Sequence, residues 1–148
     1  MGNRITSVLF ACTQNAVRSP MALGLLRMLH GNAIFVDSVG LRAGETDGFM
    51  ITVMAELGID ISKHQPKTFE DLQDHNFDLV ISLSPEAHHT ALEMTRHTSC
   101  EAEYWPILDP TWVEGNRNER LDAYRSVRDT LLERIRQRLP PGTANGGK

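Results

Sequence analysis

Short apolar runs alternate along the chain with longer segments that have helical periodicity. Four runs rich in β-branched and other apolar residues predict strands, at residues 5–11, 33–38, 77–84 and 100–108. Segments in which apolar side chains recur every three or four residues predict helices, at residues 20–30, 49–58, 69–75, 85–97 and 121–139. Strands that alternate with helices predict an α/β sandwich with a mostly parallel central sheet.

Proline, glycine and serine mark several of the expected boundaries. Pro20 suits the first turn of a helix, where the N–H that proline lacks would have no partner, and Gly31 ends that helix. Ser84, directly before a proline, predicts a capped helix start. We find no internal repeat and no linker, so we expect a single domain over residues 1–139 and a disordered tail over residues 140–148.

Composition and charge exclude several classes of protein. The 148 residues are 41% hydrophobic and 23% charged, as in an ordinary globular domain, and the net charge of −4 gives no reason to expect a nucleic-acid partner. No apolar segment approaches the ~18 residues that span a membrane, and no signal-peptide core is visible, so we expect a cytoplasmic protein. Cys12 and Cys100 form no disulfide framework and no CxxC motif, so no metal is expected.

The stretch that begins with Cys12 carries the strongest chemical signal. Five residues separate Cys12, at the end of the first predicted strand, from Arg18 and Ser19 at the start of a helix. A loop this short turns its N–H groups inward and forms an anion-binding nest at the helix N-terminus. Arg18 adds a planar pair of donors suited to phosphate oxygens, and Ser19 can donate a hydrogen bond to the sulfur.

This positive environment would keep the Cys12 thiolate available beneath a bound phosphate, which predicts a covalent phosphocysteine intermediate. The alternative is that Cys12 is a small buried hydrophobe and Arg18 a surface cation. The joint occurrence of the cysteine, the Arg-Ser-Pro spacing and the strand–loop–helix pattern favours the catalytic interpretation.

A phosphocysteine route also needs an acid for the leaving oxygen and a base for the attacking water. Asp109, after the fourth predicted strand, is the best candidate, although an Asp-Pro turn is its alternative interpretation. The carboxyl ends of parallel strands meet at one sheet edge, so Cys12, Ser38, Ser84 and Asp109 should converge there. Asp37 is the competing carboxylate, which we interpret as structural.

Several motifs in order, C-TQNAV-RS, DSVG, GIDISKH, DLVISLS and LDP, resemble the bacterial low-molecular-weight protein tyrosine phosphatases over about residues 4–139. Arsenate-reductase relatives share the cysteine and arginine signature. The resemblance implies a three-layer sandwich with a central four-stranded parallel sheet and a phosphate-binding loop after the first strand. It further implies cofactor-free, metal-free hydrolysis of phosphotyrosine by a cytoplasmic monomer or weak homodimer.

The resemblance also assigns roles to individual residues. It implies that Cys12 is the nucleophile, Arg18 the phosphate ligand and Asp109 the general acid. The implied phosphate-binding loop comprises Thr13, Gln14, Asn15, Ala16, Val17 and Arg18.

A supporting network is implied as well. Ser19 would stabilise the thiolate, Asn15 would hold a strained backbone through its side chain, and Ser38 would bond that asparagine. His64 resembles a histidine of the same network; its alternative is a loop histidine in solvent.

The chain departs from the family pattern at three places. Gln14 replaces a usual glycine, so it is either strained at positive φ or projects over the pocket rim and alters substrate choice. Val17 stands where many relatives have a second cysteine. The loop after DSVG lacks a large aromatic, so Trp112 is the better substrate wall, with a core anchor for the C-terminal helix as its alternative.

Three functions therefore remain open. The first is hydrolysis of phosphotyrosine, on a protein or as a small aryl phosphate. The second is arsenate reduction, because arsenate mimics phosphate; with only Cys100 besides Cys12, and Cys100 expected at the start of a buried strand, it needs an external thiol. The third is a phosphate-recognition module without turnover, which Gln14 alone favours.

Overall fold

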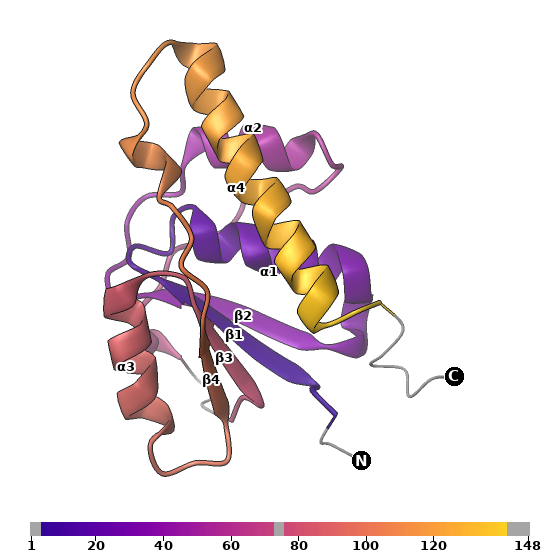
Figure 1. The fold of residues 1–148 in the computed structure, drawn as a ribbon, viewed down its shortest axis with the longest axis vertical. Helices are drawn as coiled ribbons and strands as arrows, with labels where there is room; N and C mark the ends of the chain where they lie inside the picture. The colour runs from indigo at the N-terminus through magenta and orange to yellow at the C-terminus, as the bar shows by residue number, and fades with distance from the viewer. Residues whose placement is uncertain (1–3, 73–75, 142–148) are drawn as a thin grey trace.

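A parallel four-stranded sheet forms the centre of the molecule in the computed structural model, which describes residues 4–72 and 76–141 (Figure 1). The strand order is β2-β1-β3-β4. The strands are β1 (Ser7–Cys12), β2 (Phe35–Gly40), β3 (Leu79–Ser82) and β4 (Glu101–Tyr104). The helices are α1 (Arg18–His30), α2 (Gly48–Ala55), α3 (Pro85–Thr95) and α4 (Arg117–Arg138), with short 3₁₀ helices at η1 (Gly31–Ala33), η2 (Phe69–Asp71) and η3 (Pro110–Trp112). The predicted three-layer α/β sandwich with four parallel strands is confirmed.

Helices cover both faces of the sheet, but unequally. The larger core lies under α1, α2 and α4, whereas α3 packs on the opposite face (Figure 1). Side chains of β1 alternate between the two cores: Val8 and Phe10 enter the larger one, Leu9 and Ala11 the smaller one. β1 is therefore buried on both faces, as its nearly continuous apolar sequence predicts.

The helix boundaries follow local chemistry more closely than apolar periodicity. α4 begins at Arg117, before the first periodic residue Leu121, because Asn116 and Glu119 form a reciprocal capping box. Ser84 caps α3 as predicted, accepting from the backbone N–H of Ala87 at 3.3 Å. The helix predicted over residues 69–75 is shorter: η2 ends at Asp71, and residues 73–75 lie outside the described residues.

The last two strands are shorter than predicted. β4 ends at Tyr104, and Pro106 shortly beyond it has no N–H to donate to a ladder. The chain from Trp105 onward then runs over the end of the sheet to η3 (Figure 1). Most of the tail predicted over residues 140–148 lies outside the described residues, so that boundary stays a prediction.

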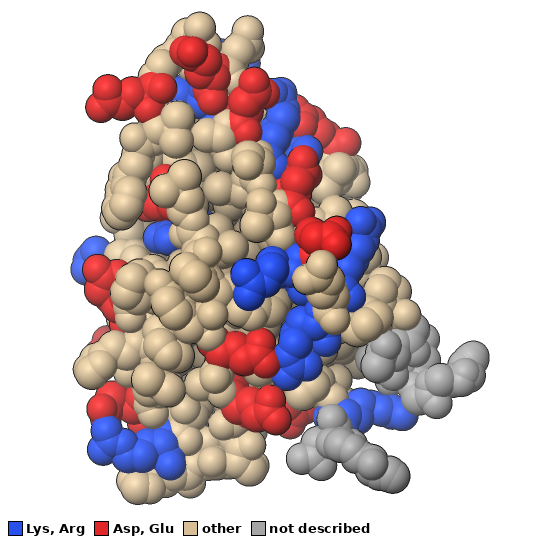
Figure 2. Space-filling model, in the orientation of Figure 1, with Lys and Arg blue, Asp and Glu red and all other residues tan. Residues whose placement is uncertain are grey.

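Charged side chains of both signs are interleaved along α4 on the face shown in Figure 2. Arg125 pairs with Glu56 at 2.8 Å, and Arg138 pairs with Glu103 at 2.6 Å, which ties α4 to the segment after α2 and to β4. None of the helices in the described part of the chain combines the length and apolarity needed to cross a bilayer.

The strand order also determines where a ligand can bind. The chain passes from β1 to β2 on one side, and β3 then joins β1 on the other side. In such a sheet, the crevice at the carboxyl ends of the strands where the order reverses is the expected ligand site. Here that crevice lies at the ends of β1 and β3, where the loop after Cys12 begins.

Candidate functional site

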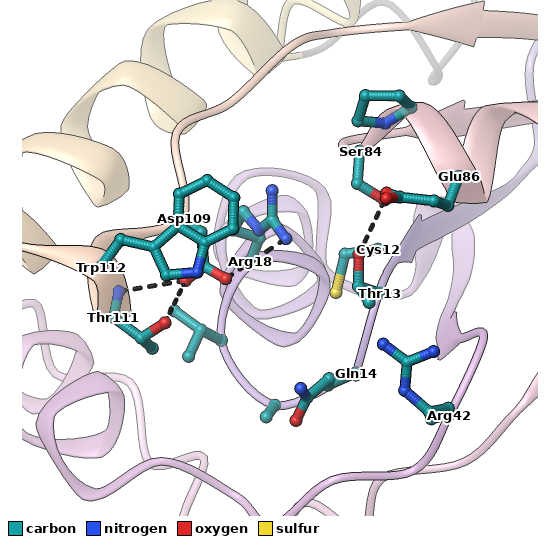
Figure 3. A pocket seen from close by; sticks show the side chains of 13 residues that line it. Cys12, Thr13, Gln14, Arg18, Arg42, Ser84, Glu86, Asp109, Thr111 and Trp112 are labelled. Atoms are coloured by element: carbon teal, nitrogen blue, oxygen red, sulfur yellow. Dashed lines mark hydrogen bonds and ion pairs between the residues drawn. The ribbon is translucent and has the colours of Figure 1, made fainter.

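A cavity of about 380 Å³ opens at this carboxyl edge, between the loops that follow all four strands (Figure 3). Cys12, Ser84 and Asp109 line it, as the predicted convergence requires. Ser38 lies instead behind the loop that follows Cys12, where it is fully buried. The structure thus brings the predicted nucleophile and the predicted acid to one cavity.

The carbonyl groups of the loop at residues 12–16 are turned away from the cavity. Backbone N–H groups of residues 41–47 donate to four of them: Leu41 to Cys12 (3.2 Å), Arg42 to Thr13 (3.0 Å), Gly44 to Gln14 (2.9 Å) and Asp47 to Ala16 (3.3 Å). In a trans peptide the N–H points opposite to the preceding carbonyl, so the N–H groups of residues 13–17 are directed toward the cavity. α1 has no side-chain cap at its start, which leaves its first N–H groups available as well. This is a nest for a tetrahedral oxyanion.

Gly40 allows residues 41–47 to come this close to the loop. A Cβ atom on Gly40 would lie 2.6 Å from the backbone nitrogen of Asn15 and 2.7 Å from the carbonyl oxygen of Arg42. Real Cβ atoms essentially never approach backbone so closely, so any larger residue would push β2 and the loop apart.

Asn15 holds the loop from behind. Its φ of 54° is in the left-handed region, which asparagine tolerates better than most residues. Its side-chain Nδ2 donates to Ser19 at 2.8 Å and to Ser38 at 2.9 Å, and its Oδ1 accepts from the backbone N–H of Lys67 at 2.9 Å. The bond between Asn15 and Ser38 is the one that the resemblance implied, and the bond between Asn15 and Ser19 was not expected.

His64 supports the same residue through the backbone. Its Nε2 lies 3.0 Å from the carbonyl oxygen of Asn15, and because a carbonyl can only accept, Nε2 carries the proton. Burial lowers the pKa of His64 and so favours the neutral ring. The alternative of a loop histidine in solvent is therefore wrong.

Asp37 lies outside this cavity, paired with Lys67 at 2.7 Å. The backbone N–H of Lys67 donates to the side chain of Asn15, so Asp37 contacts a residue that supports the loop. This agrees with the structural interpretation of Asp37.

Cys12 lies at the bottom of the cavity, only 2% exposed. Its Sγ is 2.9 Å from the hydroxyl oxygen of Ser19. With the sulfur ionised, that hydroxyl is the donor. The inward N–H groups of residues 13–17 direct their positive partial charges into the same cavity, which Arg18 also lines.

Arg18 is buried, and backbone carbonyl groups of the segments that follow β3 and β4 hold its side chain in place. Its Nη1 donates to the carbonyl oxygens of Leu83 at 3.2 Å and Ile107 at 2.9 Å. Its Nη2 lies 3.6 Å from Oδ2 of Asp109. Because Nη1 is held by the scaffold, Nε and Nη2 are the groups that an oxyanion in the cavity can use.

Asp109 is oriented by the first turn of η3 (Figure 3). Its Oδ1 accepts from the backbone N–H of Thr111 at 3.0 Å and from the Thr111 hydroxyl at 2.7 Å. Oδ2 is thereby directed toward Arg18, with one-fifth of the side chain exposed. One carboxylate oxygen is fixed and the other is placed where a proton could be exchanged with a ligand.

Trp112 stands at the opening of the cavity, 75% exposed. The alternative that it anchors the C-terminal helix in the core is wrong, because its side chain is exposed while Trp105 and Tyr124 are buried in the larger core. Its indole lies beside Asp109 at the rim of the cavity (Figure 3).

Gln14 is free of the strain considered above. Among the described residues other than glycine, only Asn15 has positive φ. The Gln14 side chain lies against Gly44 and lines the cavity, so its amide borders the ligand space. Val17, nearly buried, lines the cavity where a second cysteine could otherwise stand.

Sequence reasoning missed the contribution of residues 41–47 and of the start of α3. Arg42 and Glu86 line the cavity, and Thr13 donates its hydroxyl proton to Ser84 at 3.1 Å. The closely spaced Gly40 and Gly44 were the available signal, because glycine often marks a close backbone approach.

Cys100 lies at the other end of the sheet from Cys12. In the sheet register, Val8 of β1, Leu79 of β3 and Glu101 of β4 lie side by side. Cys100 comes one residue before Glu101, whereas Cys12 comes four residues after Val8. Five residue steps correspond to roughly 16 Å along the strands. A disulfide needs Cα atoms within about 7 Å. Burial also raises the pKa of the Cys100 thiol, which disfavours its thiolate.

No group of three or more potential metal ligands occurs in the two described ranges, residues 4–72 and 76–141.

Known proteins resemble this chain in both sequence and fold. The model of the low molecular weight phosphotyrosine protein phosphatase family matches residues 7–142. An arsenate reductase of Bacillus licheniformis is 33% identical over 131 residues, 88% of this chain and 93% of that protein. A solved arsenate reductase in a phosphate-binding state has a TM-score of 0.75 at 30% identity, covering 90% of this chain and 95% of the other. The Erwinia amylovora tyrosine phosphatase, at 20% identity with a TM-score of 0.71 over 89% of each chain, shares the fold.

Proposed function

Because this chain belongs to the low molecular weight phosphotyrosine protein phosphatase family, we propose that it is an enzyme in which Cys12 attacks a tetrahedral oxyanion, and that the oxyanion is arsenate. The sequence alone favoured phosphotyrosine hydrolysis. Relatives at 30% identity and above favour the arsenate alternative, since they are named arsenate reductases. The observation that carries the proposal is a buried thiol facing an oxyanion nest, with no second thiol within reach.

Arsenate would bind with its oxygens on the N–H groups of residues 13–17 and on Nε and Nη2 of Arg18. Phosphate and arsenate are both tetrahedral and anionic, so the same donors serve either one. The central atom would then lie next to Sγ of Cys12, in line for attack.

In the first step the Cys12 thiolate forms a bond to arsenic, and one arsenic–oxygen bond breaks. The leaving oxygen departs as water once it has received a proton, for which Asp109 is the placed donor. Arsenic is still As(V) at this stage, bound to the sulfur of Cys12.

In the second step an external thiolate attacks the sulfur of Cys12. A sulfur–sulfur bond forms, and the electron pair of the sulfur–arsenic bond leaves with arsenic as arsenite, As(III). Two sulfurs are oxidised to one mixed disulfide while arsenic gains two electrons. A second molecule of the thiol then attacks the mixed disulfide and frees Cys12.

The external thiol follows from the position of Cys100. Because Cys100 lies about 16 Å from Cys12 along the sheet, it cannot attack Cys12 without rearrangement of β4. Only Gln14 favoured the third function, a phosphate-recognition module without turnover, and the backbone of Gln14 is unstrained.

Hydrolysis of an aryl phosphate is a second candidate, and Trp112 favours it. An exposed indole beside the cavity offers a surface against which a substrate ring can stack. In that reaction Asp109 would protonate the leaving phenolate and later accept a proton from the water that attacks phosphocysteine.

The two functions are separated by one set of assays on the wild type, Cys12→Ser and Cys100→Ser. Arsenite formation from arsenate with an added small thiol, lost in Cys12→Ser and retained in Cys100→Ser, would support arsenate reduction. Release of p-nitrophenol from its phosphate without arsenite formation under any thiol would overturn it in favour of hydrolysis. Loss of arsenite formation in Cys100→Ser would contradict the external thiol.

A further inference from the structure

Arg42 is a cation on the cavity wall whose side chain is paired with no described residue. Its backbone N–H is fixed by the carbonyl oxygen of Thr13 at 3.0 Å, so its side chain starts from a defined point beside the loop. The side chain is exposed and makes neither a hydrogen bond nor an ion pair with any described residue. In Figure 3 it rises toward Thr13, across the cavity from Asp109 and Trp112.

The other charged side chains that line the cavity do not compete with Arg42 for this role. Arg18 is buried, held by carbonyl groups and paired with Asp109. Glu86, on the first turn of α3, borders the same side of the cavity as Arg42 but forms no ion pair with it (Figure 3). Arg42 is therefore the cation of the described cavity wall that is free for a second anionic group.

The dimensions of the site leave room for a second molecule. The cavity of about 380 Å³ is within the range of small-molecule sites, and a tetrahedral oxyanion has only five non-hydrogen atoms. Because Cys12 is only 2% exposed, a thiol that attacks its sulfur must be narrow enough to enter the cavity. A small thiol satisfies this condition.

We propose that Arg42 forms the binding subsite for the carboxylate of the small thiol that completes arsenate reduction, an inference that rests on the proposed function. The thiol places its sulfur against Cys12 and its carboxylate against the guanidinium of Arg42, which steers and orients it. Arg42 acts as a specificity residue for the reductant, not for arsenate, which the loop and Arg18 hold.

A matched pair of thiols tests the subsite. Mercaptopropionate and mercaptopropanol have the same chain length and differ in a carboxylate against a hydroxymethyl group. The measured quantity is the ratio of their kcat/KM values, each per concentration of thiolate, from the rate of arsenite formation at low salt. An exposed ion pair predicts a ratio of roughly two to five in the wild type, which should decline as salt screens the charges.

Variants of Arg42 separate charge from structure. Arg42→Lys should keep the preference for mercaptopropionate, Arg42→Gln should reduce the ratio to about one, and Arg42→Glu should invert it. Arg136→Gln is the matched control, because Arg136 is exposed on α4 and is not among the described residues that line the cavity. Since the readout is a ratio within one variant, a general loss of activity does not imitate the result.

Two failures are distinguishable. A wild-type ratio of one, or a ratio that persists in Arg42→Gln, would overturn the subsite while arsenate reduction stands. Absence of arsenite with both thiols would overturn the proposed function and the subsite with it.

Discussion

The imidazole Nε2 of His64 lies 3.0 Å from the carbonyl oxygen of Asn15, 49 residues away in sequence. Asn15 is the residue of left-handed φ in the loop between Cys12 and Arg18. The hydrogen bond turns the fifth carbonyl of the loop outward, in addition to the four held by residues 41–47. The shape of the loop is therefore maintained by residues that lie outside the loop in sequence.

The titration of His64 should appear in the stability of the protein. Burial lowers its pKa below the ordinary value of 6.5, so between the lowered pKa and 6.5 the unfolded chain binds more protons than the folded one. The free energy of unfolding should therefore fall as the pH decreases from about 7 toward the lowered pKa of His64. Denaturant unfolding at a series of pH values measures this slope.

In His64→Gln, whose amide can still donate to Asn15, that part of the slope should disappear. The exposed His89→Gln variant is the control and should keep it. An unchanged slope in His64→Gln would show that His64 does not titrate in this range.

Gly40→Ala should damage the oxyanion nest without touching a ligand group. The added Cβ would meet the backbone of Asn15 at 2.6 Å, so β2 and the loop must separate. We expect a loss of stability of about 1–3 kcal/mol, typical of overpacking, and at least about tenfold weaker phosphate binding by calorimetry. Gly48→Ala is the control, since a Cβ on Gly48 meets no atom within 4 Å. Normal phosphate binding by Gly40→Ala would argue against the close approach as the determinant of loop shape.

Asp109→Asn should slow the hydrolysis of p-nitrophenyl phosphate by roughly 10²–10⁴, the usual worth of a general acid. The amide can still accept from Thr111 through its oxygen, so the orientation of the side chain is kept. Phosphate affinity should survive, because the loop and Arg18, which we propose as the binding groups, are left unchanged. Stopped-flow or steady-state release of p-nitrophenol measures the rate, and wild-type turnover in this variant would remove Asp109 as the acid.

The sequence predicted the features that depend on local pattern. Apolar alternation located β1, and the spacing of Cys12 and Arg18 located the loop and the start of α1. Contacts between distant backbones have no such pattern: nothing in the sequence indicates that Arg18 bonds the carbonyl of Ile107 or that Arg42 bonds that of Thr13. For the same reason Arg42 was missed as a residue of the site.

Trp112 illustrates a different limit. A large aromatic side chain before an amphipathic helix is equally compatible with a core position and with a pocket wall. The choice depends on the course of the chain after β4, where Trp105 takes the buried position against Phe10 and leaves Trp112 exposed.

The most direct test of the account is the covalent state of Cys12 during arsenate turnover. The protein is mixed with arsenate and mercaptopropionate, quenched with acid and analysed by intact mass and peptide mapping, with Cys100→Ser in parallel. We expect a mixed disulfide between one mercaptopropionate and Cys12 in both proteins, formed only when arsenate is present. A disulfide between Cys12 and Cys100, or arsenite production with Cys12 never modified, would contradict the account.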